Sequence, residues 1–154
     1  MINVNFNPNL NATLEAELFV IASQTTIQEV DPDREIEVTL VITDDAQIKD
    51  LNRQFREMDN VTDVLSFPSD EIDLDTGKPY LGDIIISFPQ ALLQATQAGH
   101  PVETELQLLT VHGMLHLLGF VHPNEEEKRV MWAIQAKVLE KLGLAGIKIL
   151  EGQY

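Results

Sequence analysis

The stretch that most constrains the fold is residues 101–118, because its apolar residues point in nearly every direction around a helix. Pro101 suits the first turn of such a helix, and Gly119 suits the position just after its end. A helix that is apolar on all sides belongs in the core of a domain and not on its surface. We therefore predict a buried central helix over this range.

Strand patterns and helix patterns alternate along the rest of the chain. Strands are expected at residues 2–6, 35–43, 63–67 and 82–87, and further helices at 13–30, 44–55, 89–97 and 124–142. Thr13 is the expected N-cap of the first helix. This order predicts an α+β domain, in which a small mixed β-sheet packs against several helices around the buried one.

The chain has 154 residues and no cysteine. This length predicts a single domain over residues 1–154 with a sizeable core. The lack of cysteine excludes disulfides, thiolate zinc sites and cysteine nucleophiles, and it suits a reducing cytoplasm. No stretch approaches 18 apolar residues and no signal-peptide pattern begins the chain, so we expect a cytoplasmic location and no membrane partner.

The formal net charge is −15, from 25 acidic and 10 basic residues. Taken alone, this balance argues against a nucleic-acid partner, because phosphate binding relies on a local excess of positive charge. It favours solubility and, more weakly, a cationic or metal partner. A net charge is a sum over the whole chain, however, whereas a binding site is local.

The segment HGMLHLLGFVH, residues 112–122, holds three histidines. His112 and His116 are four residues apart and therefore neighbours on one face of the predicted helix. Gly119 allows a left-handed helix end, so that the chain turns back and brings His122 within reach. Three protein nitrogens with an open fourth position are typical of a catalytic zinc site.

The alternative for any one of these histidines is a buried core residue that hydrogen-bonds to its surroundings. With four histidines in 154 residues, this spacing arises by chance in only about 0.003 of chains, which favours the metal site. His100 lies between a glycine and a proline and is expected in a loop.

The spacing of the histidines and Gly119 is also that of the metzincin peptidases, with one difference. Those peptidases carry a glutamate directly after the first histidine, where it acts as general base, and this chain has Gly113. A positioned general base contributes about 10²–10⁴-fold to a rate. We therefore predict the ligand arrangement of such an enzyme without its peptidase chemistry.

Three segments together resemble a known family. HGMLHLLGFVHP, residues 112–123, resembles the signature of the YbeY-type rRNA maturation factors, which are single-strand-specific metallo-endoribonucleases. LNRQFREMDNVTDVLSFP (51–68) and LGDIIIS (81–87) resemble two further segments of that family, in the same order along the chain. One departure is Val121, where the family usually has aspartate before the third histidine. An acidic residue there would tune the metal site, as partners of metal ligands do.

The resemblance assigns roles to individual residues. It implies that His112, His116 and His122 bind the metal, with His112 also counted as catalytic, and that Arg56 is the family's functional arginine. The guanidinium of an arginine suits a phosphate, although at the end of a helix it also acts as a C-terminal cap.

Two aspartates and two phenylalanines have weaker assignments. Asp63 and Asp83 begin strands and are candidates to hydrogen-bond the metal ligands, with a simple turn role as the alternative. Phe55 and Phe67 are expected in the core and not as platforms for RNA bases.

The resulting hypothesis is an enzyme of ribosomal RNA maturation and ribosome quality control that uses Zn²⁺ or another divalent transition metal. Its expected partners are single-stranded rRNA and the ribosome or ribosomal proteins, with no DNA. Given the acidic chain, we predict a local basic groove built from four residues, Arg53, Arg56, Lys128 and Arg129. Two alternatives remain: a zinc-dependent hydrolase of a non-RNA substrate, and a non-catalytic ribosome assembly factor that contains a metal.

Overall fold

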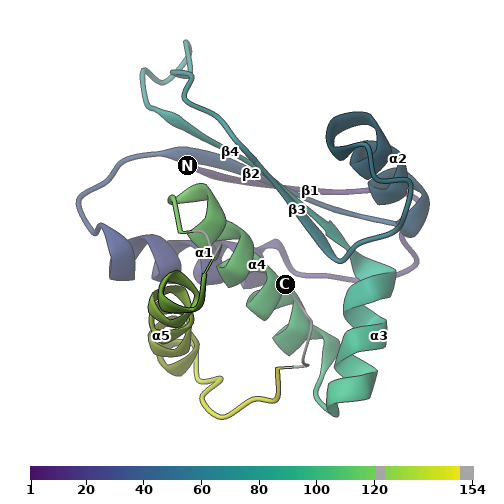
Figure 1. The fold of residues 1–154 in the computed structure, drawn as a ribbon. Coiled ribbons are helices and arrows are strands. Elements are labelled where there is room, and N and C mark those ends of the chain that lie inside the picture. Colours follow the sequence, from purple (N-terminus) through teal and green to yellow (C-terminus); the bar gives the residue numbers. More distant parts are fainter. Residues whose placement is uncertain (121–123, 150–154) are drawn as a thin grey trace.

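The computed structural model describes residues 1–120 and 124–149 of the chain. Within these ranges, strands and helices follow one another in the predicted order, which confirms the α+β class (Figure 1). The elements are β1 (Ile2–Phe6), α1 (Ala16–Val30), β2 (Glu37–Thr43), α2 (Asp45–Arg56), β3 (Val64–Pro68), β4 (Tyr80–Ser87), α3 (Phe88–Ala98), α4 (Val102–Leu117) and α5 (Glu125–Lys141).

The four strands form one mixed sheet in the order β1-β2-β4-β3. β1, β2 and β4 are parallel. Helix α1 carries the chain back between β1 and β2, whereas between β2 and β4 the antiparallel strand β3 returns it. β3 is the antiparallel edge strand and pairs with β4 through contacts such as Leu65 with Ile85. The sheet therefore has β2 and β4 at its centre, and both strands are mostly buried.

The helices cover the two faces of the sheet unequally. Figure 1 shows α1, α3, α4 and α5 on one face and α2 alone on the other. The larger core joins Phe19 of α1 and Met114 of α4 to the sheet residues Leu40 and Ile84. The smaller core beneath α2 contains only three fully packed side chains, Ile48, Leu65 and Ile85. Helix α4 therefore lies at the centre of the molecule and α2 at its periphery.

The prediction of a buried central helix is confirmed in detail. Eleven of the sixteen residues of α4 are buried. One side of α4 packs on β3 and β4, and other sides pack on α1, α3 and α5. An element enclosed in this way holds the orientation of its side chains firmly, because a displacement would disturb several packed surfaces at once.

The start of the first helix differs from the prediction. Thr13 is exposed and does not cap α1, which begins three residues later with Glu15 at the N-cap and no side-chain cap bond. The residues before the helix are held by apolar contacts instead, because Leu10 and Leu14 pack against the larger core. The caps of α2 and α3 follow the usual chemistry, with Asp44 and Ser87 accepting hydrogen bonds from backbone N–H groups.

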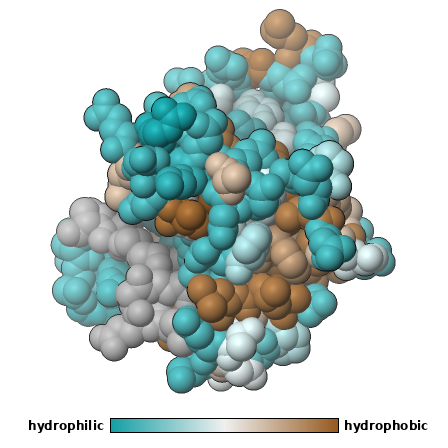
Figure 2. All heavy atoms as spheres, turned by 90° about the vertical axis from the view of Figure 1, so that its right-hand side faces the viewer, coloured by the Kyte–Doolittle hydropathy of each residue, from teal (hydrophilic) through white to brown (hydrophobic). Residues whose placement is uncertain are grey.

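Among the described residues, no helix combines the length and the apolar character that crossing a membrane requires. Figure 2 views the side of the molecule that carries α2 and α3, and hydrophilic residues cover most of it. Hydrophobic residues gather in its lower half, in the region of α3, where Leu92 and Leu93 are each about half exposed.

Candidate metal centre

Helix α4 brings two of the predicted ligands together. The Nε2 atoms of His112 and His116 lie 2.9 Å apart, and the two rings meet nearly edge to face at 75°. Two nitrogens bound to one tetrahedral zinc, each at 2.0–2.1 Å, are about 3.3 Å apart. The two Nε2 atoms are thus at hydrogen-bonding distance, with one nitrogen donating to the other, and they are also close to the spacing that one shared ion requires. The described part of the site fits such an ion.

The two histidines differ in their surroundings. His112 is only 2% exposed, and its Nδ1 lies 3.2 Å from Oε1 of Gln135 on α5. His116, one turn further along α4, is half-buried. The pair thus has a buried side fixed by a hydrogen bond and a side that is open to approach from solvent.

The end of α4 reverses the chain directly after the histidine pair. Gly119 adopts φ +101°, a left-handed conformation that favours glycine. Its N–H donates to His116 O at 3.1 Å, and Phe120 N–H donates to Leu115 O at 3.0 Å. These two bonds form a Schellman motif, in which the chain folds back over the last turn of the helix. The turn predicted from Gly119 is therefore present.

The third predicted ligand, His122, lies outside the described residues, as does Val121. Within residues 1–120 and 124–149, no group of three histidine, aspartate or glutamate side chains is placed to hold a metal ion. A three-ligand site at this position would therefore need a donor from outside these ranges. The assignment of His122 stays a prediction.

Gly113 explains why the general base of the metzincin peptidases has no counterpart here. A Cβ atom at this position would lie 3.0 Å from Cγ2 of Ile84 on β4 and 3.3 Å from Oγ of Ser66 on β3. The side of α4 next to His112 is therefore packed directly on the sheet. A glutamate there would point into the core and not towards a substrate.

Arg56 belongs to a different helix from the histidine pair. It is the last residue of α2, it is exposed, and α2 covers the opposite face of the sheet from α4 (Figure 1). Phe55, the residue before it, is 65% exposed, so the prediction that it belongs to the core is wrong. The small core under α2 extends only to Leu51 and Phe67, and Phe55 touches the ring of Phe67 edge-on from outside.

The residues of the predicted basic groove come from two helices. Arg53 pairs with Asp50 on the surface of α2, and Lys128 and Arg129 are exposed near the start of α5. The two helices lie on opposite faces of the sheet (Figure 1). The basic groove stays a prediction.

Comparison with known proteins identifies the family. The family model described as Endoribonuclease YbeY matches residues 5–143, which include the histidine pair, Gly113 and Arg56. The chain belongs to the YbeY endoribonuclease family.

Individual YbeY relatives are similar over most of their length. The Endoribonuclease YbeY of Acholeplasma laidlawii is 39% identical over 84% of this chain and 90% of its own. The protein of the same name from Caldanaerobacter subterraneus is 43% identical over 85% and 89% of the two chains. The solution structure of TM1509 from Thermotoga maritima has the same fold, with a TM-score of 0.57 and 23% identity over 100% of this chain and 99% of that one.

The two aspartates are held by bonds of their own in this YbeY chain. Asp63 precedes β3, accepts a hydrogen bond from Val64 N at 2.8 Å and another from Gln94 of α3 at 3.2 Å. Burial raises the pKa of Asp63 above its usual range, and those hydrogen bonds only partly offset the effect. The carboxylate therefore ties the edge strand to α3.

Asp83 faces away from the histidine helix. Its neighbour Ile84 contacts α4 at Gly113, and successive residues of a strand point to opposite faces. On the other face, Asp83 accepts a hydrogen bond from the Tyr80 hydroxyl. Burial and this carboxylate raise the pKa of Tyr80 to about 12, so the phenol stays protonated as a donor.

Sequence reasoning missed Gln135, which contacts His112 directly. Its position in the sequence of α5 could have indicated this contact. Gln135 stands on the buried side of α5 among Met131, Val138 and Leu139, where an amphipathic helix normally carries apolar residues. A polar residue in such a row needs a buried partner.

Proposed function

We propose that this chain is a single-strand-specific metallo-endoribonuclease of ribosomal RNA maturation, acting in 3′-end processing of the small-subunit rRNA and in ribosome quality control. The observation that carries the proposal is the convergence of His112 and His116 on α4, in a chain that matches the YbeY family over residues 5–143. The family is one of RNA-cleaving hydrolases, and the histidine pair supplies a place for the metal.

The metal of the proposal is one Zn²⁺ ion, with another divalent transition metal as the variant. His112, His116 and His122 would hold it and leave a position open to substrate or water. When bound, such an ion supplies Lewis-acid chemistry, which polarises a phosphoryl oxygen and makes water a stronger nucleophile near neutral pH. This chemistry does not require a strong base at position 113, where the chain has glycine.

Arg56 would act on the phosphate. A guanidinium is always charged and offers two parallel N–H donors, so it holds a phosphodiester in one orientation and stabilises the charge that grows on it during cleavage. Its exposure at the end of α2 leaves it available to an RNA strand. Asp63 and Asp83 would contribute by fixing β3 and β4, next to α4, through their bonds to Gln94 and Tyr80.

The negative net charge of the chain disfavours binding to RNA. At a net charge of −15, attraction to free RNA is weak, because nonspecific binding depends on cationic contacts with phosphates. We propose that contacts with ribosomal proteins, many of which would be cationic partners for an acidic surface, bring the enzyme to rRNA in the cytoplasm.

The packing of Gly113 bears on the alternatives. A peptidase or esterase of the metzincin kind needs a carboxylate next to His112, and the contact of that position with Ile84 leaves no room for one. A non-catalytic assembly factor is distinguished by its metal, because a structural ion is closed by four protein ligands whereas a catalytic ion keeps an exchangeable position.

The deciding experiment incubates the purified, zinc-loaded protein with a labelled single-stranded fragment of the rRNA 3′ end. The same fragment annealed to its complement tests strand specificity, and His116→Ala serves as the metal-site control. Cleavage of the single strand by the native protein alone is the expected result. No cleavage by either protein would overturn the nuclease and favour the assembly factor, and Val121→Asp would then be the first restoration to try.

A further inference from the structure

Gln135 occupies a position that packing alone does not explain. It is 1% exposed, on the face of α5 that packs against α4, and its neighbours in that row are apolar. Its Nε2 is buried and has no hydrogen-bond partner among the described residues. An unpaired buried N–H group is unfavourable, so an apolar side chain would serve packing better at this point.

The bond that Gln135 does make is to a proposed metal ligand. Its Oε1 lies 3.2 Å from Nδ1 of His112. A carbonyl oxygen only accepts hydrogen bonds, so the bond requires the imidazole proton to be on Nδ1. A neutral imidazole carries one proton, and Nε2 of His112 therefore keeps its lone pair on the side facing His116.

We propose that Gln135 is a positioning residue: it holds His112 in the Nδ1–H tautomer, with the Nε2 lone pair directed at the metal position. The inference rests on the metal centre of the proposed function and names the residue that sets the tautomer and ring orientation of one ligand. Groups of this kind, which bond the second nitrogen of a metal-binding histidine, tune the affinity of the ligand for its ion.

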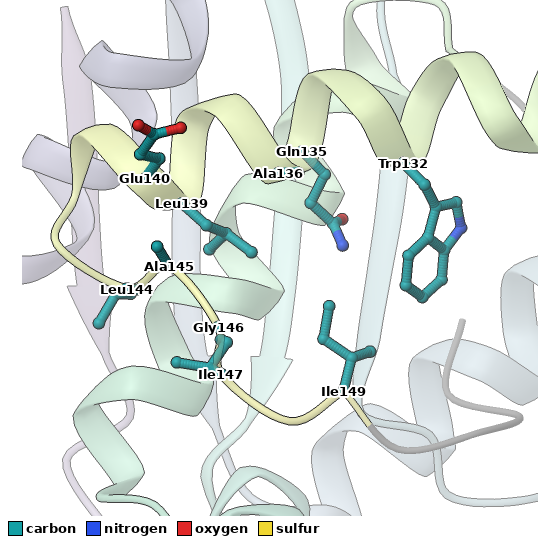
Figure 3. A pocket seen from close by; sticks show the side chains of 10 residues that line it. All are labelled: Trp132, Gln135, Ala136, Leu139, Glu140, Leu144, Ala145, Gly146, Ile147 and Ile149. Carbon is teal, nitrogen blue, oxygen red and sulfur yellow. The ribbon is translucent and has the colours of Figure 1, made fainter.

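Among the described residues, the hydrogen bond of the Gln135 amide is to His112. Figure 3 shows the Gln135 side chain reaching from α5 into a cavity of about 290 Å³. Most of the lining, such as Leu139, Ile147 and Ile149, offers no hydrogen bond to an amide. The two other polar side chains that line it are Glu140, which is exposed, and Trp132, whose Nε1 has no partner among the described residues. The reverse orientation would present N–H to Nδ1, would move the imidazole proton to Nε2 and would block metal binding there. Metal binding and the observed orientation of Gln135 therefore reinforce each other.

Three variants of α5 test the assignment. Gln135→Leu removes the acceptor with little change in volume, and Gln135→Glu keeps an oxygen acceptor at the same reach. Val138→Ala is the matched control, because Val138 is likewise a buried residue of α5. Proton–nitrogen NMR on the metal-free proteins, at about pH 8 where a histidine of ordinary pKa is neutral, reports which His112 nitrogen carries the proton. Competition with a chelator measures zinc affinity.

We expect the native protein and Val138→Ala to show the Nδ1–H tautomer, and Gln135→Leu to lose it in favour of a mixture. Zinc affinity should fall about 10–100-fold in Gln135→Leu, stay near the native value in Gln135→Glu, and stay unchanged in Val138→Ala despite a lower melting temperature. An unaltered tautomer in Gln135→Leu, or an equal loss of zinc affinity in all three variants, would overturn the inference.

The readouts separate this inference from the proposed nuclease. If the tautomer and the zinc affinity respond as expected but RNA is not cleaved, the positioning role stands and only the nuclease fails. If the native protein does not bind zinc or another divalent transition metal, both fail.

Discussion

The two helices that carry the proposed functional residues differ in how firmly the fold holds them. Eleven of sixteen residues of α4 are buried, whereas α2 buries two of twelve, Ile48 and Asn52. His112 sits in a packed environment with a fixed hydrogen bond, and Arg56 ends its helix in solvent. Metal binding needs ligand nitrogens held within fractions of an ångström, and such precision comes from packing around rigid elements. A residue that contacts a flexible strand of RNA benefits from room to adjust.

This difference predicts that changes on α4 affect the metal and the stability, whereas changes on α2 affect turnover alone. It also predicts that variants on α2 leave zinc binding unchanged, because α2 carries none of the proposed metal ligands.

The largest effect is expected for His116→Ala. The variant should lose nearly all its zinc on dialysis, and RNA cleavage should fall to background, because one of the converging nitrogens is gone. Elemental analysis of the dialysed protein measures the first outcome and the cleavage assay the second. Since His116 is only half-buried, the metal-free variant should melt close to the metal-free native protein. Full zinc occupancy in His116→Ala would remove this residue from the metal site.

The next effect belongs to α2. Arg56→Ala should lower kcat by about 10²–10³-fold, the usual loss when one charge-stabilising donor is removed. Zinc content and melting temperature should stay native, because Arg56 is exposed and is not one of the proposed metal ligands. Arg56→Lys keeps the charge without the paired donors and should recover only part of the rate. A loss of zinc in Arg56→Ala would break the separation between the two helices.

Gly113→Ala tests the packing of α4. Alanine favours a helix over glycine by about 1 kcal/mol, but its Cβ would press on Ile84 and Ser66. We expect a net loss of about 1–2 kcal/mol in the free energy of unfolding, as overpacking in a core usually gives. Gln54→Ala on the exposed side of α2 is the control and should stay within about 0.5 kcal/mol of the native protein. Urea titration measures both, and a stabilised Gly113→Ala would show that the helix can shift away from the sheet.

The sequence contained enough to predict most of the fold. The order of elements and the central position of α4 follow from apolar periodicity and from breakers such as Gly99 and Gly119, which are local properties of the chain. The approach of His112 to His116 follows equally from their spacing on one helix. The role of both residues as metal ligands stays a prediction, as does that of His122.

What the sequence could not predict depends on contacts between elements. Thr13 does not cap α1 as predicted, because apolar contacts with the core hold the segment before the helix. Phe55 is exposed because the core under α2 is small, and the sequence of α2 does not show the size of that core. Gln135 meets His112 only because α5 packs against α4, a pairing 23 residues apart in sequence. The polar group in its apolar row was visible, but its partner was not.

The smallest effect concerns Asp63, the carboxylate that joins β3 to α3 on the histidine side of the sheet. Its pKa is raised by burial, so between its ordinary value of 3.8 and the raised one the folded protein binds the proton more tightly than the unfolded chain. Stability must then decrease as pH rises through that window. Asp63→Asn, which stays neutral, should lack this decrease and be the more stable protein at pH 7, with the difference closing as pH falls towards 4. Thermal melts across that range measure it, with Asp59→Asn in an exposed loop as the control for loss of one charge. If Asp63 only stabilises the fold, RNA cleavage by Asp63→Asn at pH 7 should stay near the native rate. A loss of cleavage in a variant that is more stable than the native protein would show that this carboxylate takes part in the reaction.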